Sequence, residues 1–587
     1  MKRQLSVSEP SNQPSTKTDI LRFKVKPDGK SSIEYYFSEK VRNGIEIKWV
    51  SADGSSKGRF TPDENGKCIQ TVNTDTWIYV YYTYQESGTY SAYLSQDACN
   101  SNSYDIKIQT GDNRIITSLD VSGCTALTSL FCHDNQLTAL DISGCTALTK
   151  LDCYNNQLRS LDVSKNTALE WLDCYNNQLT SLDVSQNTAL TELECGSNQL
   201  TSLDVSQNTA LMRLCCNENR LTALDASGCT ALTDLGCDEN QLTSLDVSGC
   251  TSLTDLWCVG NQLASLDVSK NTALTRLSCH DNQLTSLNVS GCTALKWLEC
   301  YSNQLTSLDV SKNTALPELY CSGNRLTILD VSKNTALTWL ECDNNQLTSL
   351  DVSKNTALRC LWCTGNRLTS LDVSGCTALT YLYCADNRLT GLDVSHNTDL
   401  EGLGCSENQL STLDLSNNIR LEWLDCGENQ LTALDISKNT ALTKLYCGSN
   451  QLTVLDVSQN TALKGLDCVN NHIPLSDIYK AYIQNPDWER FEAYGQSDTL
   501  TLPIDQVLDL SSERLLGESL STFEISPDAY TENNFTFQFK KAQAYTLSIE
   551  NTGIINHIPE TCDDDSLDGT VSTFIYHISV DSEKSAR

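Results

Sequence analysis

The sequence has few basic residues for its length. Its 587 residues include 41 Lys and Arg against 74 Asp and Glu, which gives a formal net charge of −33. A nucleic-acid-binding surface needs clustered Lys and Arg to neutralise phosphates, so this balance disfavours a DNA or RNA partner. It equally disfavours attachment to an anionic membrane surface. The composition therefore indicates a large, acidic and soluble chain without a nucleic-acid partner.

Long apolar runs are also lacking. No run approaches the length of a membrane-spanning helix, which needs roughly 18 consecutive apolar residues. The first 19 residues, MKRQLSVSEPSNQPSTKTD, contain no apolar stretch and form no recognisable secretory signal. The sequence therefore predicts no membrane insertion.

Cysteine, in contrast, is abundant and periodic. Of the 28 cysteines, 17 recur every 21 residues from Cys132 to Cys468. The unit around each is L-x-x-L-x-C-x-x-N-Q/R-L-T-x-L-D-V-S-x-N/C-T-A, and 17 units of 21 residues make 17 × 21 = 357 residues. A fixed period of this length indicates a solenoid. The unit resembles the leucine-rich repeat, with Cys in place of the third leucine, and predicts a leucine-rich repeat solenoid over residues 111–471.

Each unit predicts a short strand. The L-x-C segment alternates with period two, so its Leu and Cys are expected to point into the core. Stacked units would form a parallel sheet on the concave side, with strands about 4.8 Å apart, opposite a mostly irregular or 3-10 convex side. The Asn three residues after each of these cysteines, from Asn135 to Asn471, is expected to turn the chain. Its amide can satisfy backbone groups of the next coil, which predicts an asparagine ladder.

The 17 periodic cysteines, called the cysteine ladder below, are predicted to be buried thiols. Their Cβ atoms would lie near the strand spacing of about 4.8 Å, whereas a disulfide needs roughly 3.8 Å. A metal site needs ligands that converge on one point, which a line of residues does not provide. Six further cysteines share a second register with the same period: Cys124, Cys145, Cys229, Cys250, Cys292 and Cys376. Cys68 and Cys99 lie outside the repeats and either pair in an oxidising compartment or stay free.

A second periodic feature is the Asp of L-D-V-S, which runs from Asp120 to Asp456 with Asn288 as the one exception. Unit charges about 4.8 Å apart repel by roughly 1 kcal/mol in water. An Asx-turn, in which the carboxylate accepts the backbone N–H two residues on, would offset this repulsion. Asn288 can make the same bond without charge. Calcium binding along this line is the alternative, although it would need additional converging oxygens.

The periodic repeat with a strand cysteine in every unit resembles the cysteine-ladder repeats of the internalin family of bacterial surface adhesins. The wording L-T-S-L-D-V-S-x-N-T-A-L also resembles tandem repeats of Bacteroidetes surface proteins. The resemblance covers roughly residues 114–471 and implies a bacterial adhesin that is secreted or displayed at the cell surface. The L-P-x-T-G wall-sorting motif of internalins is not present near the C-terminus.

The flanks of the repeats differ in composition. Trp49-Val-Ser-Ala-Asp53-Gly54 and Tyr82-Thr-Tyr84, with Gly88-Thr-Tyr90, resemble motifs of PKD-like (polycystic kidney disease) domains, which implies a β-sandwich that shields the edge of the first coil. After the repeats, Ser476–Ile483 has apolar residues at helical spacing with Ser476 as N-cap, and predicts a capping helix. The predicted organisation is a disordered segment (1–19), a PKD-like β-sandwich (20–110), the solenoid (111–471), a helical cap (472–494), an Ig-like β domain (495–580) and a disordered tail (581–587).

Every aromatic residue of the repeats falls at one of three outward-pointing strand positions, equivalent to residues 129, 131 and 133. Outward Trp and Tyr commonly anchor ligands, although aromatic residues also suit strands in general. Five consecutive coils, those of Cys300 to Cys384, carry a dense group, whereas the coils of Cys195, Cys216 and Cys237 carry none. The predicted ligand-binding residues are Trp297, Glu299, Tyr301, Tyr320, Trp339, Glu341, Trp362, Tyr381 and Tyr383.

The same three positions hold 13 acidic residues and four basic ones. Two ligand classes suit this mixture. Sugars stack their C–H faces on aromatic rings while carboxylates accept hydroxyl protons, and basic proteins are attracted to an acidic aromatic surface. The sequence does not separate the two classes.

Catalysis is disfavoured, since the sequence lacks G-x-S-x-G, P-loop, H-E-x-x-H and dinucleotide-binding motifs. His133 and His280 share a position but lie seven coils apart, about 34 Å at the strand spacing, so they cannot form one site. We therefore predict no catalytic residue, no metal site and no cofactor. The predicted function is that of a non-catalytic protein or glycoprotein binder. The alternatives are a carbohydrate-binding surface adhesin and an intracellular scaffold, for which reduced cysteines are suited.

Overall fold

The computed structural model describes residues 127–485 and 488–497 with their side chains, together with Leu119, Val121 and Ile575. For the strands elsewhere in residues 20–120 and 498–581 it describes the backbone. The chain divides into two compact units, Met1–Leu295 and Lys296–Arg587, called unit 1 and unit 2 below. Each unit is described by itself.

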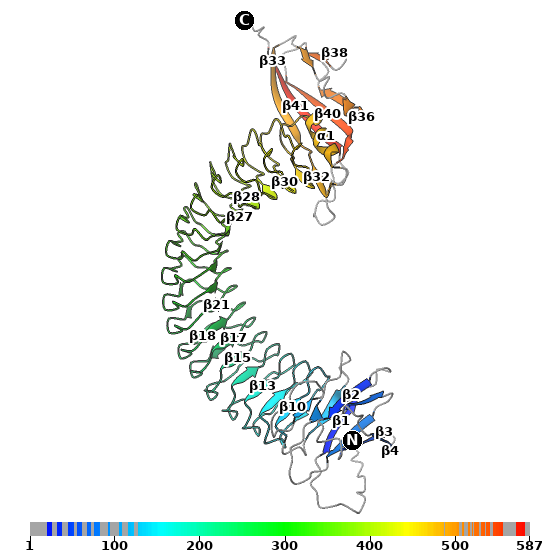
Figure 1. Cartoon of the computed structure of the whole chain (residues 1–587), viewed down its shortest axis with the longest axis vertical. Coiled ribbons are helices and arrows are strands. Elements are labelled where there is room, and N and C mark those ends of the chain that lie inside the picture. Colours follow the sequence, from blue (N-terminus) through cyan, green and yellow to red (C-terminus); the bar gives the residue numbers. More distant parts are fainter. Residues whose placement is uncertain are drawn as a thin grey trace, which may run out of the picture. The chain divides into compact units, whose positions relative to one another are not determined.

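The repeats of unit 1 form a parallel sheet with one short strand per coil (Figure 1). Neighbouring strands pair in register, and paired residues are 21 positions apart in the sequence, as Leu130 and Leu151 are. The strands are β10 (Ser129–Phe131), β12 (Lys150–Asp152), β13 (Trp171–Asp173), β14 (Glu192–Glu194), β15 (Arg213–Cys215), β17 (Asp234–Gly236), β19 (Asp255–Trp257) and β21 (Arg276–Ser278).

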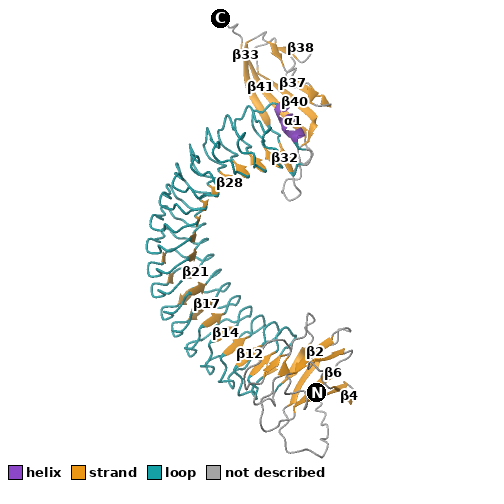
Figure 2. Ribbon diagram, in the orientation of Figure 1, coloured by secondary structure: helices purple, strands orange, loops and turns teal. Residues whose placement is uncertain are grey.

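The repeats of unit 2 continue the same pattern, with parallel neighbours again in register. In each unit the strands occupy one edge of the coils and loops form the rest (Figure 2). The strands are β23 (Trp297–Glu299), β24 (Glu318–Tyr320), β25 (Trp339–Glu341), β26 (Cys360–Trp362), β27 (Tyr381–Tyr383), β28 (Gly402–Gly404), β29 (Trp423–Asp425), β30 (Lys444–Tyr446), β31 (Gly465–Asp467) and β32 (Arg490–Glu492).

Several coils of unit 1 contain a second short strand that the sequence did not predict. These strands lie in the L-D segment, and β16 pairs with β18, and β20 with β22, in parallel. They are β11 (Leu140–Asp141), β16 (Ala223–Asp225), β18 (Ser244–Asp246), β20 (Leu266–Asp267) and β22 (Leu287–Asn288). Elsewhere the loop side consists of tight turns, such as the turn closed by the 3.1 Å hydrogen bond from the Leu148 N–H to the Cys145 carbonyl. The loop side is thus irregular, one of the two forms predicted, and in the described residues it consists of such single turns.

Strands also precede the repeats. β8 pairs in parallel with β10, and β9 pairs in parallel with β11, so these strands add to the first coils. The strands are β1 (Ile20–Val25), β2 (Ser32–Phe37), β3 (Ile45–Ser51), β4 (Ser56–Phe60), β5 (Lys67–Thr71), β6 (Thr76–Tyr82), β7 (Ala92–Tyr93), β8 (Asp105–Lys107) and β9 (Ile116–Asp120). A PKD-like sandwich in residues 20–110 stays a prediction, and residues 1–19 lie outside the described residues.

Further strands follow the repeats, among which β33, β41, β40 and β37 form one sheet. They are β33 (Gln496–Pro503), β34 (Val507–Asp509), β35 (Leu515–Leu516), β36 (Ser519–Leu520), β37 (Thr522–Ser526), β38 (Tyr530–Asn533), β39 (Thr536–Phe539), β40 (Ala544–Ile555) and β41 (Val571–Asp581). The Ig-like domain at 495–580 likewise stays a prediction, and residues 582–587 lie outside the described residues.

The core of each unit is the interior of the coils. Every residue of the cysteine ladder is at most 1% exposed, and the leucines before and after it are equally buried. All described cysteines are free thiols, as predicted for the ladder. Burial raises the pKa of the Cys300 and Cys384 thiols to about 12, so they stay protonated. Cys68, Cys99 and Cys124 lie outside the residues whose side chains are described.

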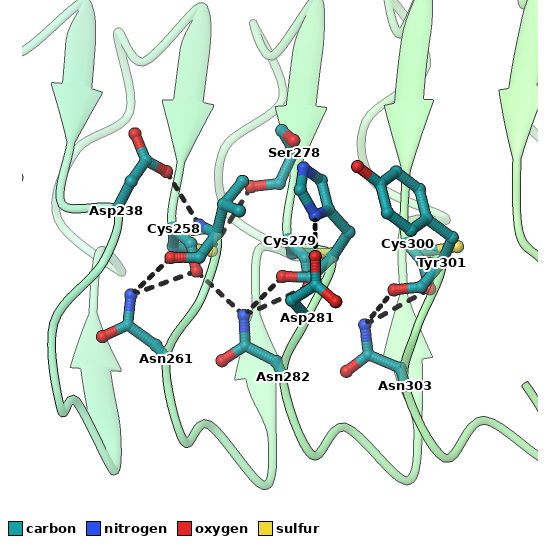
Figure 3. A network of polar contacts seen from close by, with 12 residues as sticks. Asp238, Cys258, Asn261, Ser278, Cys279, Asp281, Asn282, Cys300, Tyr301 and Asn303 are labelled. Atoms are coloured by element: carbon teal, nitrogen blue, oxygen red, sulfur yellow. Dashed lines mark hydrogen bonds and ion pairs between the residues drawn. The ribbon is translucent and has the colours of Figure 1, made fainter. Parts of the chain in front are cut away.

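The predicted asparagine ladder is present, although its bonds between coils run to the preceding coil and not to the next one (Figure 3). The amide nitrogen of Asn282 donates to the carbonyl of Cys279 in its own coil at 3.2 Å and to that of Cys258 in the preceding coil at 2.9 Å. Its amide oxygen accepts the N–H of Leu263 at 3.0 Å. Each asparagine thus joins two coils and satisfies buried backbone groups that would otherwise cost about 1–3 kcal/mol each.

A second buried ladder lies on the loop side, at the second cysteine register. Asn at this position donates to two carbonyls of the preceding coil, as Asn187 does to Val163 at 3.0 Å and Asn166 at 2.8 Å. Cysteine replaces Asn in some coils, and the Cys250 thiol donates to the Ala226 carbonyl at 3.1 Å. The additional cysteines of this register are therefore hydrogen-bonding substitutes for asparagine rather than a separate chemical feature.

The aspartates of L-D-V-S form the predicted Asx-turns. The carboxylate of Asp183 accepts the N–H of Ser185 at 2.9 Å, and other coils repeat this bond. Asn288 makes the equivalent bond with Ser290 at 3.1 Å. The hydrogen bonds from Ser185 hold the pKa of Asp183 below its usual value, which offsets the repulsion between neighbouring carboxylates.

The C-terminal end of the solenoid differs from the prediction in two respects. Helix α1 spans Leu475–Gln484, and its N-cap is Pro474, so Ser476 lies inside the helix and is not the cap. The helix is followed by β32, whose Phe491 takes the position of a repeat leucine opposite Leu466. The region 472–494 is thus a helix plus one more strand of the parallel sheet.

The last ladder position is filled by a glutamine. The Gln496 side chain accepts the N–H of Ile473 at 3.0 Å and donates to the carbonyls of Cys468 and Ala493 at 2.7 and 3.2 Å. Asparagine makes the same three bonds in the regular coils, together with a fourth to the carbonyl two residues before it. Phe491, Ala493 and Gln496 therefore stand for the Leu, Cys and Asn of a degenerate final repeat.

Candidate functional site

The predicted binding residues all lie on the outward face of the parallel sheet of unit 2. We call this surface the strand face; it comprises the outward positions of β23 to β32 and the residue that follows each adjoining cysteine. The nine predicted residues are half-buried there, except for the more exposed Tyr381. Because alternate strand residues point to opposite sides, the buried Leu and Cys force their neighbours onto this face.

Aromatic rings on the strand face touch one another in a continuous series. Successive ring centroids lie 5.3, 6.4, 6.0, 5.2, 5.4 and 6.4 Å apart, within the range of favourable ring contacts. We call this series the aromatic row; its members are Trp297, Tyr320, Trp339, Trp362, Tyr383, Trp423 and Tyr446. The members lie at the first or the third position of their strands, so the row runs along the sheet from coil to coil. Five of them belong to the predicted site.

The row extends further than the sequence predicted because of one glycine. The coil of Cys405 has Gly402 and Gly404 at the outward positions of β28, so no side chain stands between Tyr383 and Trp423. A Cβ atom at Gly404 would lie 2.9 Å from the Tyr383 ring and 3.1 Å from the Trp423 ring. The two rings therefore meet across a whole coil, which adds Trp423 and Tyr446 to the site.

Carboxylates are bonded to the polar atoms of the aromatic row. The indole N–H of Trp339 donates to Glu341 at 2.7 Å, and the Tyr320 hydroxyl donates to Glu318 at 2.8 Å. These bonds hold each carboxylate beside its ring. The Tyr381 hydroxyl donates in the same way to Glu401 at 3.2 Å. Aromatic and acidic groups thus form pairs rather than separate patches.

Several of these acids are hard to ionise. Burial raises the pKa of Asp343 to about 6, although a hydrogen bond from the Thr364 N–H lowers that pKa in part. Burial also raises the pKa of Glu341, the Trp339 bond lowers it, and the nearby Glu299 charge raises it. Burial is therefore the main reason that these two carboxylates resist ionisation.

Arginine side chains lie over aromatic rings in both units. In unit 2 the Arg490 guanidinium lies 5.2 Å from the Tyr446 ring centroid. It also pairs with Glu492 at 2.5 Å and with Asp467 at 3.7 Å. In unit 1 the Arg276 guanidinium lies 5.4 Å from the Trp257 ring.

Among the residues of unit 1 with described side chains, the outward face has the following ring pairs and no continuous row. Phe131 lies 6.2 Å from Trp171, and His133 stacks on Tyr154 at 4.6 Å. The His133 Nδ1 also contacts the Asp152 carboxylate at 2.7 Å, and both side chains are buried. These contacts are isolated, which agrees with the aromatic-free coils in the middle of unit 1.

Comparison with known proteins decides the family. The repeats match the model for Leucine Rich repeats (2 copies) over residues 112–166. The functional domain of InlJ from Listeria monocytogenes, which includes a cysteine ladder, is 33% identical. That match covers 79% of this chain and 93% of the InlJ chain, with a TM-score of 0.60. This chain belongs to the leucine-rich repeat proteins with a cysteine ladder.

YopM from Yersinia enterocolitica WA-314 shares the fold of this cysteine-ladder protein. It is 24% identical over 63% of this chain and 83% of the YopM chain, with a TM-score of 0.50. No curated protein sequence matches the chain. In proteins of this fold the extended sheet surface is the usual binding surface, which makes the strand face the first candidate.

Two further properties of the cysteine-ladder protein bear on its site. Among the residues with described side chains, no group of three or more His, Cys, Asp and Glu is placed to hold a metal ion. In the same part of the chain, no helix has the length and apolar character to cross a membrane. His280 contacts Asp281 at 2.7 Å and belongs to a different coil from the His133 pair.

Proposed function

We propose that this leucine-rich repeat protein is a non-catalytic interaction protein that binds a protein or glycoprotein ligand on the strand face of unit 2. The aromatic row carries the proposal. Seven half-exposed rings in mutual contact, bordered by oriented carboxylates, provide large and rigid contact area with little conformational entropy to lose. Truncation of a residue in such a cluster commonly costs about 2 kcal/mol or more of binding energy.

The finer assignment follows the internalin resemblance. We propose that the protein is secreted or displayed at a bacterial cell surface and acts as an adhesin, with β domains at 20–110 and 495–580 on either side of the solenoid. A cysteine ladder without disulfides suits a reducing compartment as well, so location is tested separately. Antibody labelling of intact cells of the source organism, against permeabilised cells, distinguishes a displayed protein from an intracellular scaffold.

The binding test compares three tryptophans. Trp339→Ala and Trp362→Ala should each weaken ligand binding by at least about 2 kcal/mol, roughly 30-fold, because both lie inside the aromatic row. Trp257→Ala is the matched control, since Trp257 occupies the same strand position as Trp362 but lies in unit 1 outside the row. Surface plasmon resonance against the ligand found by protein pull-down or glycan array measures the effect. Equal affinities for Trp339→Ala, Trp362→Ala and wild type would place the site elsewhere.

A further inference from the structure

The chain already seats arginine side chains on its outward sheet face. Arg490 combines a ring contact with Tyr446 and ion pairs with two carboxylates. Arg276 repeats the arrangement in unit 1, with its guanidinium over Trp257 and its Nε 3.8 Å from Asp255. A ring face together with a carboxylate from the same or an adjacent coil therefore forms a guanidinium site in this fold.

Two other places in the aromatic row combine a ring with a carboxylate but carry no arginine. Trp339 with Glu341, and Tyr320 with Glu318, each join a half-exposed ring to an oriented carboxylate. Neither Glu318 nor Glu341 forms an ion pair with a basic side chain of the described residues. The strand face of unit 2 carries two basic residues, Lys444 and Arg490. Its acidic residues are Glu299, Glu318, Glu341, Asp343, Asp425, Asp467 and Glu492.

Guanidinium is the group that fits such pairs best. It is planar, weakly hydrated and able to stack on a ring while donating two parallel hydrogen bonds to a carboxylate. An ammonium group offers only a strongly hydrated point charge. Sugar rings need open, flat aromatic faces, whereas successive rings of the row are tilted by 37° to 79° and pack against one another.

We propose that the aromatic row binds an arginine-bearing segment of a partner polypeptide, with guanidinium groups seated on Trp339 and Tyr320 and paired with Glu341 and Glu318. Charge complementarity supports this occupant, because the acids on the strand face outnumber its bases. Burial is the main cause of the raised pKa of Glu341, so an adjacent cation would stabilise its ionised form. The inference rests on the proposed function and names the chemistry of the protein partner.

The test uses three synthetic peptides of the same length that differ only in the identity of one repeated residue. Each has three identical residues separated by Gly-Ser, and these residues are arginine, lysine or citrulline, the last being a neutral analogue of arginine. Isothermal titration with the full-length protein at about 50 mM salt should show the arginine peptide binding at least tenfold tighter than the citrulline peptide. The lysine peptide should bind between the two. Equal affinity of the arginine and citrulline peptides, or of the arginine and lysine peptides, would overturn the proposal.

Variants show whether the aromatic row is the binding site. Glu318→Gln with Glu341→Gln should weaken arginine-peptide binding at least tenfold. Glu170→Gln with Glu239→Gln removes the same net charge from two exposed residues of unit 1, outside the row, and should change arginine-peptide binding less than twofold. An equal loss in both double variants would reduce the effect to general electrostatics and overturn the proposal. Circular dichroism melting of each variant confirms that the fold is kept.

The same set separates this inference from the proposed function. Binding of a protein or a glycan that depends on Trp339, without discrimination between arginine and citrulline, would overturn the guanidinium assignment and leave the strand face as the binding surface. Binding of the arginine peptide and of every identified ligand that is unchanged in Trp339→Ala would overturn both.

Discussion

At the scale of single residues, the molecule depends on small polar side chains that are buried without charge. A thiol fits the interior of a coil as a small apolar group, and burial keeps it protonated. Asparagine fits because its amide can donate and accept at once, and so satisfies the backbone of two coils. A residue of similar size that cannot meet these demands should destabilise the coil.

Cys300→Ser tests this at the centre of the ladder. We expect a loss of about 1–3 kcal/mol in unfolding free energy, because the serine hydroxyl would be buried without good hydrogen bonds. A thiol is less polar and tolerates the same site. Cys215→Ser is the control, since Cys215 is half-exposed on the outward face. Urea unfolding of both variants measures the difference. Thiol titration of the native protein should leave the ladder cysteines unreactive until denaturant is added, and a disulfide between adjacent ladder positions would contradict the assignment.

At the scale of the coil, two positions vary together. Each cysteine of the second register follows a glycine, as in Gly249-Cys250, whereas each asparagine there follows Lys, Gln, His or Asn. The Cys250 thiol donates to the Ala226 carbonyl of the preceding coil, and Asn187 donates to the equivalent carbonyl of Val163. A Cβ atom at Gly249 would lie 1.8 Å from the Ser227 carbonyl oxygen. The close approach explains the glycine.

This coupling predicts the outcome of paired substitutions. Gly249→Ala should destabilise the protein by at least about 2 kcal/mol, because its methyl group collides with backbone. Gly228→Ala should cost less, since the nearest atom to its Cβ lies 3.4 Å away. Gly249→Lys should also destabilise the protein, and adding Cys250→Asn should restore stability, because the pair Lys-Asn occurs at these positions in other coils. A double-mutant cycle of unfolding free energies measures the coupling, and simple additivity would show that the two positions are independent.

At the scale of the whole molecule, the cysteine ladder should make the folded state less stable at alkaline pH. Burial raises the pKa of the ladder thiols from an ordinary value of 9.0, to about 12 for Cys300 and Cys384. In the unfolded chain the same thiols ionise near pH 9, so the unfolded state releases protons that the folded state retains. The stability that burial maintains below pH 9 is therefore lost progressively as the pH rises through 9 toward 12.

We accordingly expect a steep fall in the urea midpoint between pH 8 and pH 10.5 in the presence of reductant. Above pH 9, each ladder thiol should lower the unfolding free energy by at most about 1.4 kcal/mol per pH unit. These losses accumulate over the coils that unfold together. Between pH 6 and pH 8 the thiols should contribute no slope, which provides the internal control. A midpoint that does not change above pH 9 would contradict the burial of the thiols.

The sequence by itself determined the solenoid, the buried cysteine ladder, the asparagine ladder and the Asx-turns, because these recur in every repeat and depend on contacts between equivalent positions. It also located the predicted binding residues on one face of the sheet, since strand alternation assigns each side chain a direction. Only the tertiary structure decided the rest. Contact between Tyr383 and Trp423 across Gly404, the close approach at Gly249 and the replacement of asparagine by Gln496 depend on distances between coils. Those distances are set by packing and by the length of each side chain, and no periodic pattern of residue types contains them.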